Sequence, residues 1–554
     1  MLIAVGVLAL ALGLRGMGVR IGQADLPTPG PTPRALPTAA PRPQPTSTWA
    51  TVWVSPAVPP EVALPVAQWV TAHPDSHRMV ADAGLARVTV GVQRPEKGEG
   101  TLISERIYVA AVPYLRPTLA GPTFAELQAQ WQAPQADEER LLWVVEASAR
   151  SAISALLGAP GDVAVEAVPA GQVAGRAWEA ERAVAFLPFE HLSPRLSPLP
   201  LGGHSVLDPQ DALEAYPLAL RIWVSGPEAL RAPLVAVLQE AGLPESNRDT
   251  QGLGRVAVAG GVALTRGVAL GIERQGDPAY PARGIGPQLA AADVTHVSHE
   301  VSFSEECAPA AVMARFCARP AYIETLLALG CDLVEVSSSR TLDAGPEAAL
   351  ASLDLYADKG LQVVGGGRNA VEAGQPLTLE VKGTRVGWLA YNQAGPPEVW
   401  AGDDRPGTAR FDLAQAVQDI ASLRPQVDVL MVHVQHTDAY AARPTSRQRL
   451  DFLALAEAGA DIVVGMQAHR PQGLEFRDGS LILYGLGNLI FDQVWSQPTR
   501  QSAVAWHTFY RGRHLATELR FTEVDEGGQP NWLEGEAAQA LWTETLAASP
   551  GKAP

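Results

Sequence analysis

Side chains that could bind a metal ion or an anion occur in four short segments of the chain. The first segment contains Glu300, the second contains Arg340 and Asp343, the third contains His436 and the fourth contains His469. Carboxylates and imidazoles are common ligands of divalent metals, and a guanidinium can hold a carboxylate or a phosphate through two parallel hydrogen bonds. These residue types allow either metal chemistry or metal-free anion binding.

The C-terminal third carries an ordered set of motifs between Pro444 and Asp492. They read Pro444-Thr445-Ser446-Arg447-Gln448, Gly465-Met466-Gln467-Ala468-His469 and Tyr484-Gly485-Leu486-Gly487-Asn488. This order resembles the CapA-type capsule synthesis family, PGA_cap, which is linked to poly-γ-glutamate capsules. The resemblance covers about half of the chain and implies a metallophosphoesterase-like fold for that half.

Most positions at which this family carries metal ligands hold other residues here. Gly261 replaces the aspartate that follows the family's first strand, and Ser339-Arg340 replaces an Asn-His pair. Gln435 stands at the place of a histidine, and the motif that ends at His469 keeps only that last histidine. Glu300 of the Asn-Leu-Glu motif is retained, and the sequence resembles a divergent branch of the family.

These replacements argue against a site for two metal ions. A dinuclear centre places two dications within ~4 Å of each other and needs a bridging carboxylate with several further ligands. Arg340 would add a permanent positive charge to such a site. The residues that remain, Glu300, His436 and His469, form a candidate set for a single metal. We therefore expect no cofactor, or at most one divalent metal.

Simpler interpretations of these residues stay open. Glu300 can pair with Arg340, and His469 can be a hydrogen-bonded histidine at the end of a strand. His296 and His433 lie on strand-like segments, which favours packing over metal binding.

No catalytic residue is identified from the sequence. The candidates for binding an anion or a substrate are Arg340, Asp343, Gln435, Gln467 and Asn488. Glycine at Gly485 and Gly487 tolerates positive φ, so these residues and Asn488 are also expected to form a turn beneath the site.

Composition limits the class of protein. The chain has 554 residues, 47% of them apolar, and a formal net charge of −17. This length suggests several domains, and the acidic balance argues against a nucleic-acid partner, which requires a basic surface. A local basic pocket for a small anion remains compatible with an acidic protein.

The N-terminus indicates export. Residues 1–24 contain a short apolar run that predicts a signal peptide or, if it is retained, a membrane anchor. Residues 25–48 are rich in proline and threonine and predict an extended linker. We expect an extracytoplasmic protein at the cell surface, in which Cys307 and Cys317 form a disulfide and Cys331 is a buried free thiol.

Alternating segments predict an α/β domain over residues 49–246. Its segments 183–189, Gly202-Gly203 and Tyr216-Pro217-Leu218 resemble a lobe of type-II solute-binding proteins, and an unrelated α/β domain is the alternative. Its expected strands are 105–114, 141–145, 183–189 and 216–224, and its expected helices are 123–131, 149–157 and 227–241.

Residues 252–525 are expected to form the CapA-type domain, as an α/β/β/α metallophosphoesterase-like sandwich. Residues 526–554 are expected to form a C-terminal tail with a peripheral helix. The expected strands of the sandwich are 333–336, 362–364, 386–391, 427–432, 461–464 and 481–484.

The resemblance implies a role in the biosynthesis or attachment of a capsule or poly-γ-glutamate surface polymer. The alternative is a non-catalytic surface protein that binds an anionic polymer or small anion in the former active-site cleft. Partners implied are the anionic polymer or its synthase machinery in the cell envelope, and whether the protein is an enzyme stays open.

Overall fold

The computed structural model describes residues 49–96, 98–114, 122–133, 141–180, 182–313 and 315–550. Met1–Thr48 and Trp49–Pro554 are separate units, and the second unit is described here. The signal peptide or anchor predicted at 1–24 and the linker predicted at 25–48 lie outside the described residues. No helix in the described ranges combines the length and the apolar character that crossing a bilayer requires.

The N-terminal part is an α/β region built on one nine-stranded sheet, in the order β2-β1-β3-β9-β4-β7-β5-β6 with β8 paired to β4. The strands are β1 Ala50–Val54, β2 His77–Met79, β3 Val88–Gly91, β4 Gly100–Pro113, β5 Leu142–Glu146, β6 Val165–Val168, β7 Ala183–Pro188, β8 Leu196–Pro198 and β9 Ala219–Ser225. The helices are α1 Pro60–Ala72, α2 Phe124–Gln132, α3 Arg150–Leu157, α4 Val173–Glu179 and α5 Glu228–Glu240.

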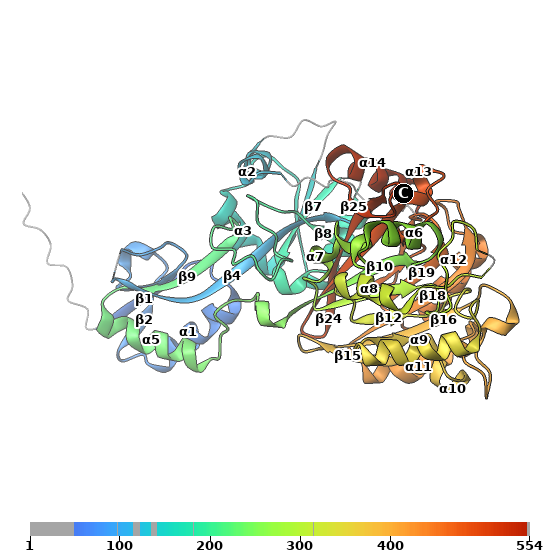
Figure 1. Cartoon of the computed structure of the whole chain (residues 1–554). Coiled ribbons are helices and arrows are strands. Elements are labelled where there is room, and N and C mark those ends of the chain that lie inside the picture. The colour runs from blue at the N-terminus through green and yellow to red at the C-terminus, as the bar shows by residue number, and fades with distance from the viewer. Residues whose placement is uncertain are drawn as a thin grey trace, which may run out of the picture. The chain divides into compact units, whose positions relative to one another are not determined.

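This region contains two separate apolar cores. Helices α1 and α5 pack on β1, β3 and β9 in one core. Helices α2, α3 and α4 pack on β4, β5 and β7 in the other. Strands β4 and β9 pair antiparallel along a shared length, and β4 continues into the second core (Figure 1).

The C-terminal part contains two large sheets. The first has the order β13-β12-β11-β10-β23-β24-β25, with β22 paired to β10. Its strands are β10 Leu253–Val262, β11 Val294–His299, β12 Leu333–Glu335, β13 Gln362–Val364, β22 Asn488–Ile490, β23 Gln501–Tyr510, β24 Arg513–Val524 and β25 Pro530–Trp532. The second sheet has the order β15-β16-β18-β19-β21-β20. Its strands are β15 Leu377–Val381, β16 Thr384–Asn392, β18 Val429–Ala439, β19 Ile462–Ala468, β20 Leu474–Arg477 and β21 Ser480–Leu483.

Short elements and helices complete this part. They are α6 Arg266–Gln275, α7 Gly286–Leu289, α8 Ile323–Ala328, α9 Pro346–Asp358, α10 Ala370–Ala373, α11 Leu413–Leu423, α12 Ser446–Glu457, α13 Gln497–Arg500, α14 Gly535–Ala548, β14 Gly366–Gly367 and β17 Gly407–Thr408.

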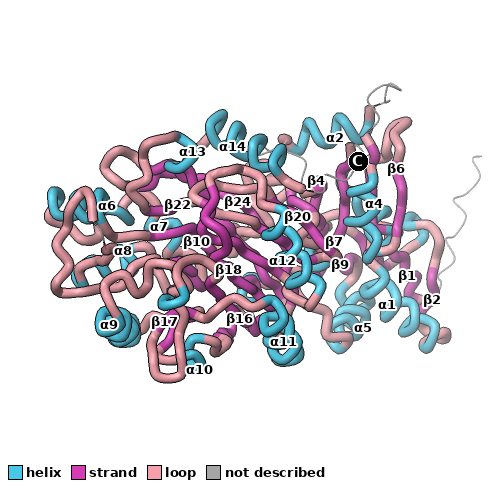
Figure 2. Tube along the Cα trace, turned by 90° about the vertical axis from the view of Figure 1, so that its right-hand side faces the viewer, coloured by secondary structure: helices cyan, strands magenta, loops and turns pink. Residues whose placement is uncertain are grey.

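Side-chain alternation along the strands creates the layers. On β18, Val429 and Met431 face the other sheet, whereas Leu430 and Val432 face the helices α11 and α12. Helices α6, α7, α8 and α9 cover the outer face of the first sheet. In Figure 2, β10 and β18 run through the middle, with α6 and α9 toward one side and α11 and α12 toward the other. The predicted α/β/β/α sandwich is confirmed.

Most predicted elements are present with shifted ends, and three differences matter for the site. Strand β18 continues to Ala439, beyond the predicted end at 432. Strands β23 and β24 form a long antiparallel pair that the sequence pattern did not reveal. Within the segment predicted as a tail, α14 places Trp542 and Leu546 in the core between the sheets.

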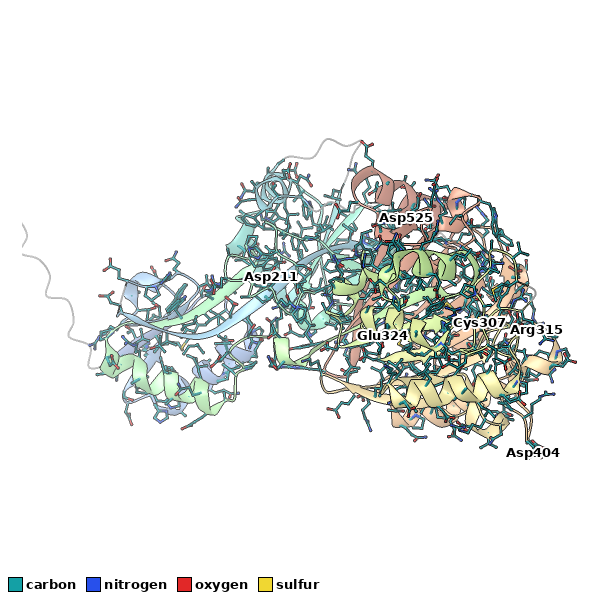
Figure 3. All side chains as sticks on the ribbon, in the orientation of Figure 1. Asp211, Cys307, Arg315, Glu324, Asp404 and Asp525 are labelled. Carbon is teal, nitrogen blue, oxygen red and sulfur yellow. A yellow bond between two sulfur atoms is a disulfide. The ribbon has the colours of Figure 1, made fainter. Side chains whose placement is uncertain are left out.

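The cysteine predictions are confirmed. Cys307 and Cys317 form a disulfide with their Cα atoms 5.8 Å apart, and Cys331 is a buried free thiol. Figure 3 marks Cys307 among the loops of the C-terminal part.

Candidate functional site

The predicted site residues follow the carboxyl ends of parallel strands, the usual location of ligand sites in such sheets. Gly261 lies at the end of β10, and Glu300 comes directly after β11. Arg340 lies in the loop after β12, and Gln435 and Gln467 lie near the ends of β18 and β19. We call this region the strand-end site.

Arg340 is the accessible cation of the strand-end site. Its side chain is 47% exposed, and its Nη1 lies 3.4 Å from Oδ2 of Asp343. The guanidinium also stacks over Phe316, 4.6 Å from the ring centroid. Arg266 approaches the same ring at 4.4 Å and pairs with Asp492. Two arginines therefore meet at one aromatic ring beside the strand ends.

Gln435 connects the two sheets instead of presenting a ligand. Its side-chain oxygen accepts a hydrogen bond from the backbone N–H of Ser339, and its buried Nε2 has no partner among the residues that the structure describes. Gln467 has φ of 70°, and its buried Oε1 likewise lacks a partner within the described ranges. A left-handed conformation costs a residue other than glycine roughly 1–2 kcal/mol. Strain of this kind is often found at functional sites.

Glu300 occupies the space that a side chain at position 261 would need. A Cβ atom on Gly261 would lie 2.8 Å from Oε1 of Glu300. Glu300 is 4% exposed, and burial raises the pKa of its carboxyl group, while His469 and Arg340 act in the opposite direction. No salt bridge joins Glu300 to Arg340 among the described residues, so Asp343 is the partner of Arg340.

His469 is held by its neighbours. Its Nδ1 lies 3.1 Å from Oδ1 of Asn488, and its Nε2 lies 3.0 Å from Oδ1 of Asp438. The ring of Tyr440 stacks on it at 4.9 Å. Asn488 in turn donates to Oε1 of Gln493, so this candidate binding residue serves as a connector within the turn.

His436 points away from the strand-end site, which corrects the predicted metal set. Neighbouring residues of a strand face opposite sides of the sheet. Gln435 therefore faces the other sheet, and His436 faces α12, where its Nε2 lies 3.1 Å from Oδ2 of Asp451. The structure does not gather Glu300, His436 and His469 into one ligand group.

A different group of possible metal ligands lies between the sheets. In the part of the chain that the structure describes, His296, Glu335 and His433 are the one set of three such side chains whose ligand atoms lie within 4.8 Å of one another. All three are fully buried. This arrangement is compatible with at most one metal ion. The sequence interpretation of His296 and His433 as packing residues was correct about burial but missed Glu335 between them.

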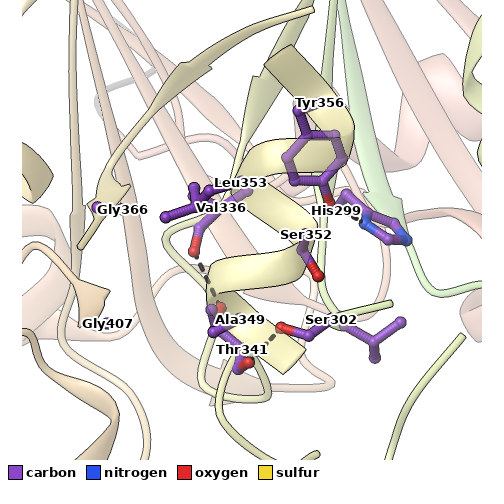
Figure 4. Close-up of a pocket in the computed structure, with 12 residues that line it drawn as sticks. His299, Ser302, Val336, Thr341, Ala349, Ser352, Leu353, Tyr356, Gly366 and Gly407 are labelled. Atoms are coloured by element: carbon purple, nitrogen blue, oxygen red, sulfur yellow. Dashed lines mark hydrogen bonds between the residues drawn. The ribbon is translucent and has the colours of Figure 1, made fainter. Parts of the chain in front are cut away.

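Two hollows are lined by none of the predicted site residues, although Ser302 and Thr341, which line the first, lie close to Glu300 and Arg340 in the sequence. One, between the β11 and β12 loops and α9, measures about 20 Å³ and has room for about one water molecule (Figure 4). His299 and Tyr356 are hydrogen-bonded beside it at 2.6 Å. The other hollow measures about 290 Å³ and lies in the N-terminal part, beside the segments that come after strands β1, β5 and β7. Glu61, Arg106 and Glu190 are among the residues that line it. Neither is continuous with Arg340 in its lining residues.

Comparison with known proteins identifies the sandwich. A sequence model of the family described as "Bacterial capsule synthesis protein PGA_cap" matches residues 255–493. The similarity to this family of bacterial capsule synthesis proteins therefore lies within the C-terminal sandwich.

Relatives whose names refer to capsule, PGA or polyglutamine synthesis match this chain at low identity. The chain is 23% identical over 296 residues to the "Capsule biosynthesis protein CapA" of Bacillus anthracis, covering 50% of this chain and 72% of the relative. It is 25% identical over 186 residues to the "PGA biosynthesis protein CapA" of Bacillus subtilis, covering 33% of this chain and 49% of the relative. It is 30% identical over 187 residues to a "Probable polyglutamine synthesis accessory protein" of Mycobacterium tuberculosis, covering 31% and 48%. The chain thus spans about half the length of two of these relatives.

Solved structures are similar only distantly. A 5'-nucleotidase precursor from Thermus thermophilus is 12% identical with a TM-score of 0.31, covering 53% of this chain and 58% of that chain. An ABC-type phosphate transport receptor from Vibrio cholerae is 12% identical with a TM-score of 0.27, covering 34% and 93%. Scores this low support no inference about what this chain binds.

Proposed function

We propose that this protein is an exported accessory protein for the biosynthesis or attachment of a capsule-type or poly-γ-glutamate-type surface polymer. In this proposal, the strand-end site binds an anionic group of the polymer through Arg340 and has no dinuclear metal centre. The observation that carries the proposal is the exposed guanidinium of Arg340 at a position where the family has a ligand histidine.

The other replaced positions also favour a site without two metals. Gly261 leaves room only for the Glu300 carboxylate, and Gln435 is hydrogen-bonded to the Ser339 backbone. Met466 is 3% exposed and packs in the core between the sheets. A bridging carboxylate and the ligands of a second ion are therefore missing from the positions that this family uses.

Arg340 retains donors for a ligand. A guanidinium has five N–H groups in a planar fork, and the ion pair with Asp343 engages Nη1 at 3.4 Å. Tyr440, which stacks on His469 of the strand-end site, is 50% exposed and adds aromatic surface there. A carboxylate of a γ-glutamyl chain can accept two parallel hydrogen bonds from this planar cation.

Export is supported by two features. The first is the apolar N-terminal run and the Pro/Thr-rich segment of the sequence. The second is the Cys307–Cys317 disulfide, because disulfides persist in oxidising compartments. The names of the relatives, which refer to capsule and polyglutamine synthesis, favour partners in the cell envelope: the polymer or its synthase machinery.

The alternative is a surface protein that only holds the anionic polymer or a small anion, with no part in synthesis. Both proposals share the same binding chemistry at Arg340. They differ in whether loss of the protein stops polymer production or only its retention at the surface. Measuring released and cell-bound polymer after deletion of the gene separates these outcomes.

Calorimetric titration of the full-length protein with a γ-glutamyl oligomer tests the binding proposal. We expect binding that is unchanged by a chelator, because the contact uses a guanidinium and no bound ion. Binding that disappears with the chelator and returns with added metal would refute this proposal.

A further inference from the structure

A buried polar cluster, separate from the strand-end site, lies between the two large sheets of the C-terminal part. We call the space between these sheets the seam. His296 on β11, Glu335 on β12 and His433 on β18 are each 0% exposed. Oε2 of Glu335 lies 3.7 Å from Nε2 of His296 and 3.5 Å from Nδ1 of His433. The two imidazole rings are 4.3 Å apart at their centroids.

Along the same strands, these residues lie two positions before the strand-end site and therefore deeper between the sheets. His433 precedes Gln435 by two positions, and Glu335 precedes Ser337 by two positions. Side chains two residues apart face the same side of a sheet, so the cluster points into the seam. Val294 and Met431, on the same strands, pack in the apolar core of the seam.

The cluster leaves an unusual number of polar atoms without partners. Among the described residues, none forms a hydrogen bond with the following atoms: both ring nitrogens of His296, both ring nitrogens of His433 and Oε2 of Glu335. The 3.5 and 3.7 Å separations are too long for hydrogen bonds. Glu335 keeps one hydrogen bond, from the hydroxyl of Ser337 to its Oε1. Burying polar atoms with so few hydrogen bonds is unfavourable.

A divalent cation would compensate these atoms. Metal–nitrogen and metal–oxygen bonds of about 2.1 Å at a tetrahedral angle place neighbouring ligand atoms about 3.4 Å apart. The two separations from Oε2 of Glu335, 3.5 and 3.7 Å, are close to this value. The hydrogen bond from Ser337 would then orient the ligating carboxylate, as outer partners of metal ligands commonly do.

We propose that His296, Glu335 and His433 form a mononuclear binding site for a first-row divalent metal, with zinc the expected ion. Two imidazoles and a carboxylate are a ligand set that zinc and its neighbours accept. The site is structural: its ligands are fully buried, and it joins β11 and β12 of one sheet to β18 of the other. It is independent of the strand-end site and of the function proposed there.

The metal content of the full-length protein, produced in zinc-supplemented medium and dialysed, tests this site. We expect about one equivalent of zinc. Glu335→Gln, which keeps the shape of the side chain, and His433→Leu should each lower it at least tenfold, because losing a ligand should cost no less than the roughly 10- to 100-fold loss of affinity that follows mutation of an outer partner. Glu300→Gln, at the strand-end site, is the matched control and should retain the ion. Circular dichroism of each variant shows whether it has folded.

Cobalt substitution provides a measurement that does not depend on the variants. Cobalt bound to two imidazoles and a carboxylate should give visible d–d absorption, which zinc should displace at one equivalent. Metal that is lost in Glu300→Gln but retained in Glu335→Gln would place the ion at the strand-end site and overturn the proposal. Absence of stoichiometric zinc and of cobalt uptake during refolding would overturn it as well.

Discussion

Replacing Arg340 by alanine should weaken anion binding more than it weakens folding. The arginine is 47% exposed and makes one ion pair, at 3.4 Å, with Asp343. An exposed ion pair contributes about 0–1 kcal/mol to stability, and the stacking on Phe316 adds about 0.5–1 kcal/mol. Hydrogen bonds to a charged group are worth about 1.5–3 kcal/mol. Arg340→Ala should therefore raise the Kd for a γ-glutamyl oligomer roughly 10- to 150-fold.

The matched control for this prediction is Arg477→Ala. Arg477 is 49% exposed and pairs with Glu457 at 2.8 Å, and its hairpin lies at the opposite end of the parallel strands. Isothermal titration calorimetry of both variants, with their unfolding measured in parallel, separates binding from stability. Equal Kd values for the wild type and Arg340→Ala, or an equal loss of affinity in Arg477→Ala, would refute the assignment of Arg340 as the anion contact.

Three further predictions follow from the same structure. Phosphomonoesters and phosphodiesters should show no metal-dependent hydrolysis with manganese, zinc or magnesium; turnover that disappears in Glu300→Gln would contradict this. Burial lowers the pKa of His299 to about 3 and that of His514 to about 4. As the pH falls below about 6.5, these two histidines become protonated in the unfolded chain while they stay neutral in the folded protein. Each of them should therefore reduce the free energy of unfolding by about 1.4 kcal/mol per pH unit, until the pH reaches its pKa in the folded protein. His299→Phe should flatten this dependence in urea titrations at pH 4–7, and an unchanged slope would count against it. Mass spectrometry of the unreduced protein should find Cys307 joined to Cys317, and two free thiols there would be evidence against export.

The sequence by itself determined the local elements and the family of the sandwich. The sequence pattern predicted a helix over residues 123–131, and the structure shows α2 there, begun by a capping box between Thr123 and Glu126. Apolar runs predicted β12, β13 and β21 within one or two residues of their ends. These features were accessible because turn chemistry, capping and hydrophobic periodicity act between residues close together in the chain.

The replaced residues of the strand-end site could also be recognised in the sequence, because each motif is only a few residues long. The sequence did not show which side of its strand each residue faces. Gln435 and His436 are neighbours, and the register of β18 against β16 and β19 decides that Gln435 faces the other sheet while His436 faces α12. Shifting that register by one residue would exchange the two faces.

Only the tertiary structure assembled the cluster in the seam. Glu335 is 39 residues from His296 and 98 residues from His433, and nothing in their spacing marks them as a group. The parallel pairing of β11 with β12 brings His296 and Glu335 together within one sheet. Packing of the second sheet across the seam then adds His433. Contacts of this kind depend on strand order and on how two sheets stack, and both are set by burial of the whole core.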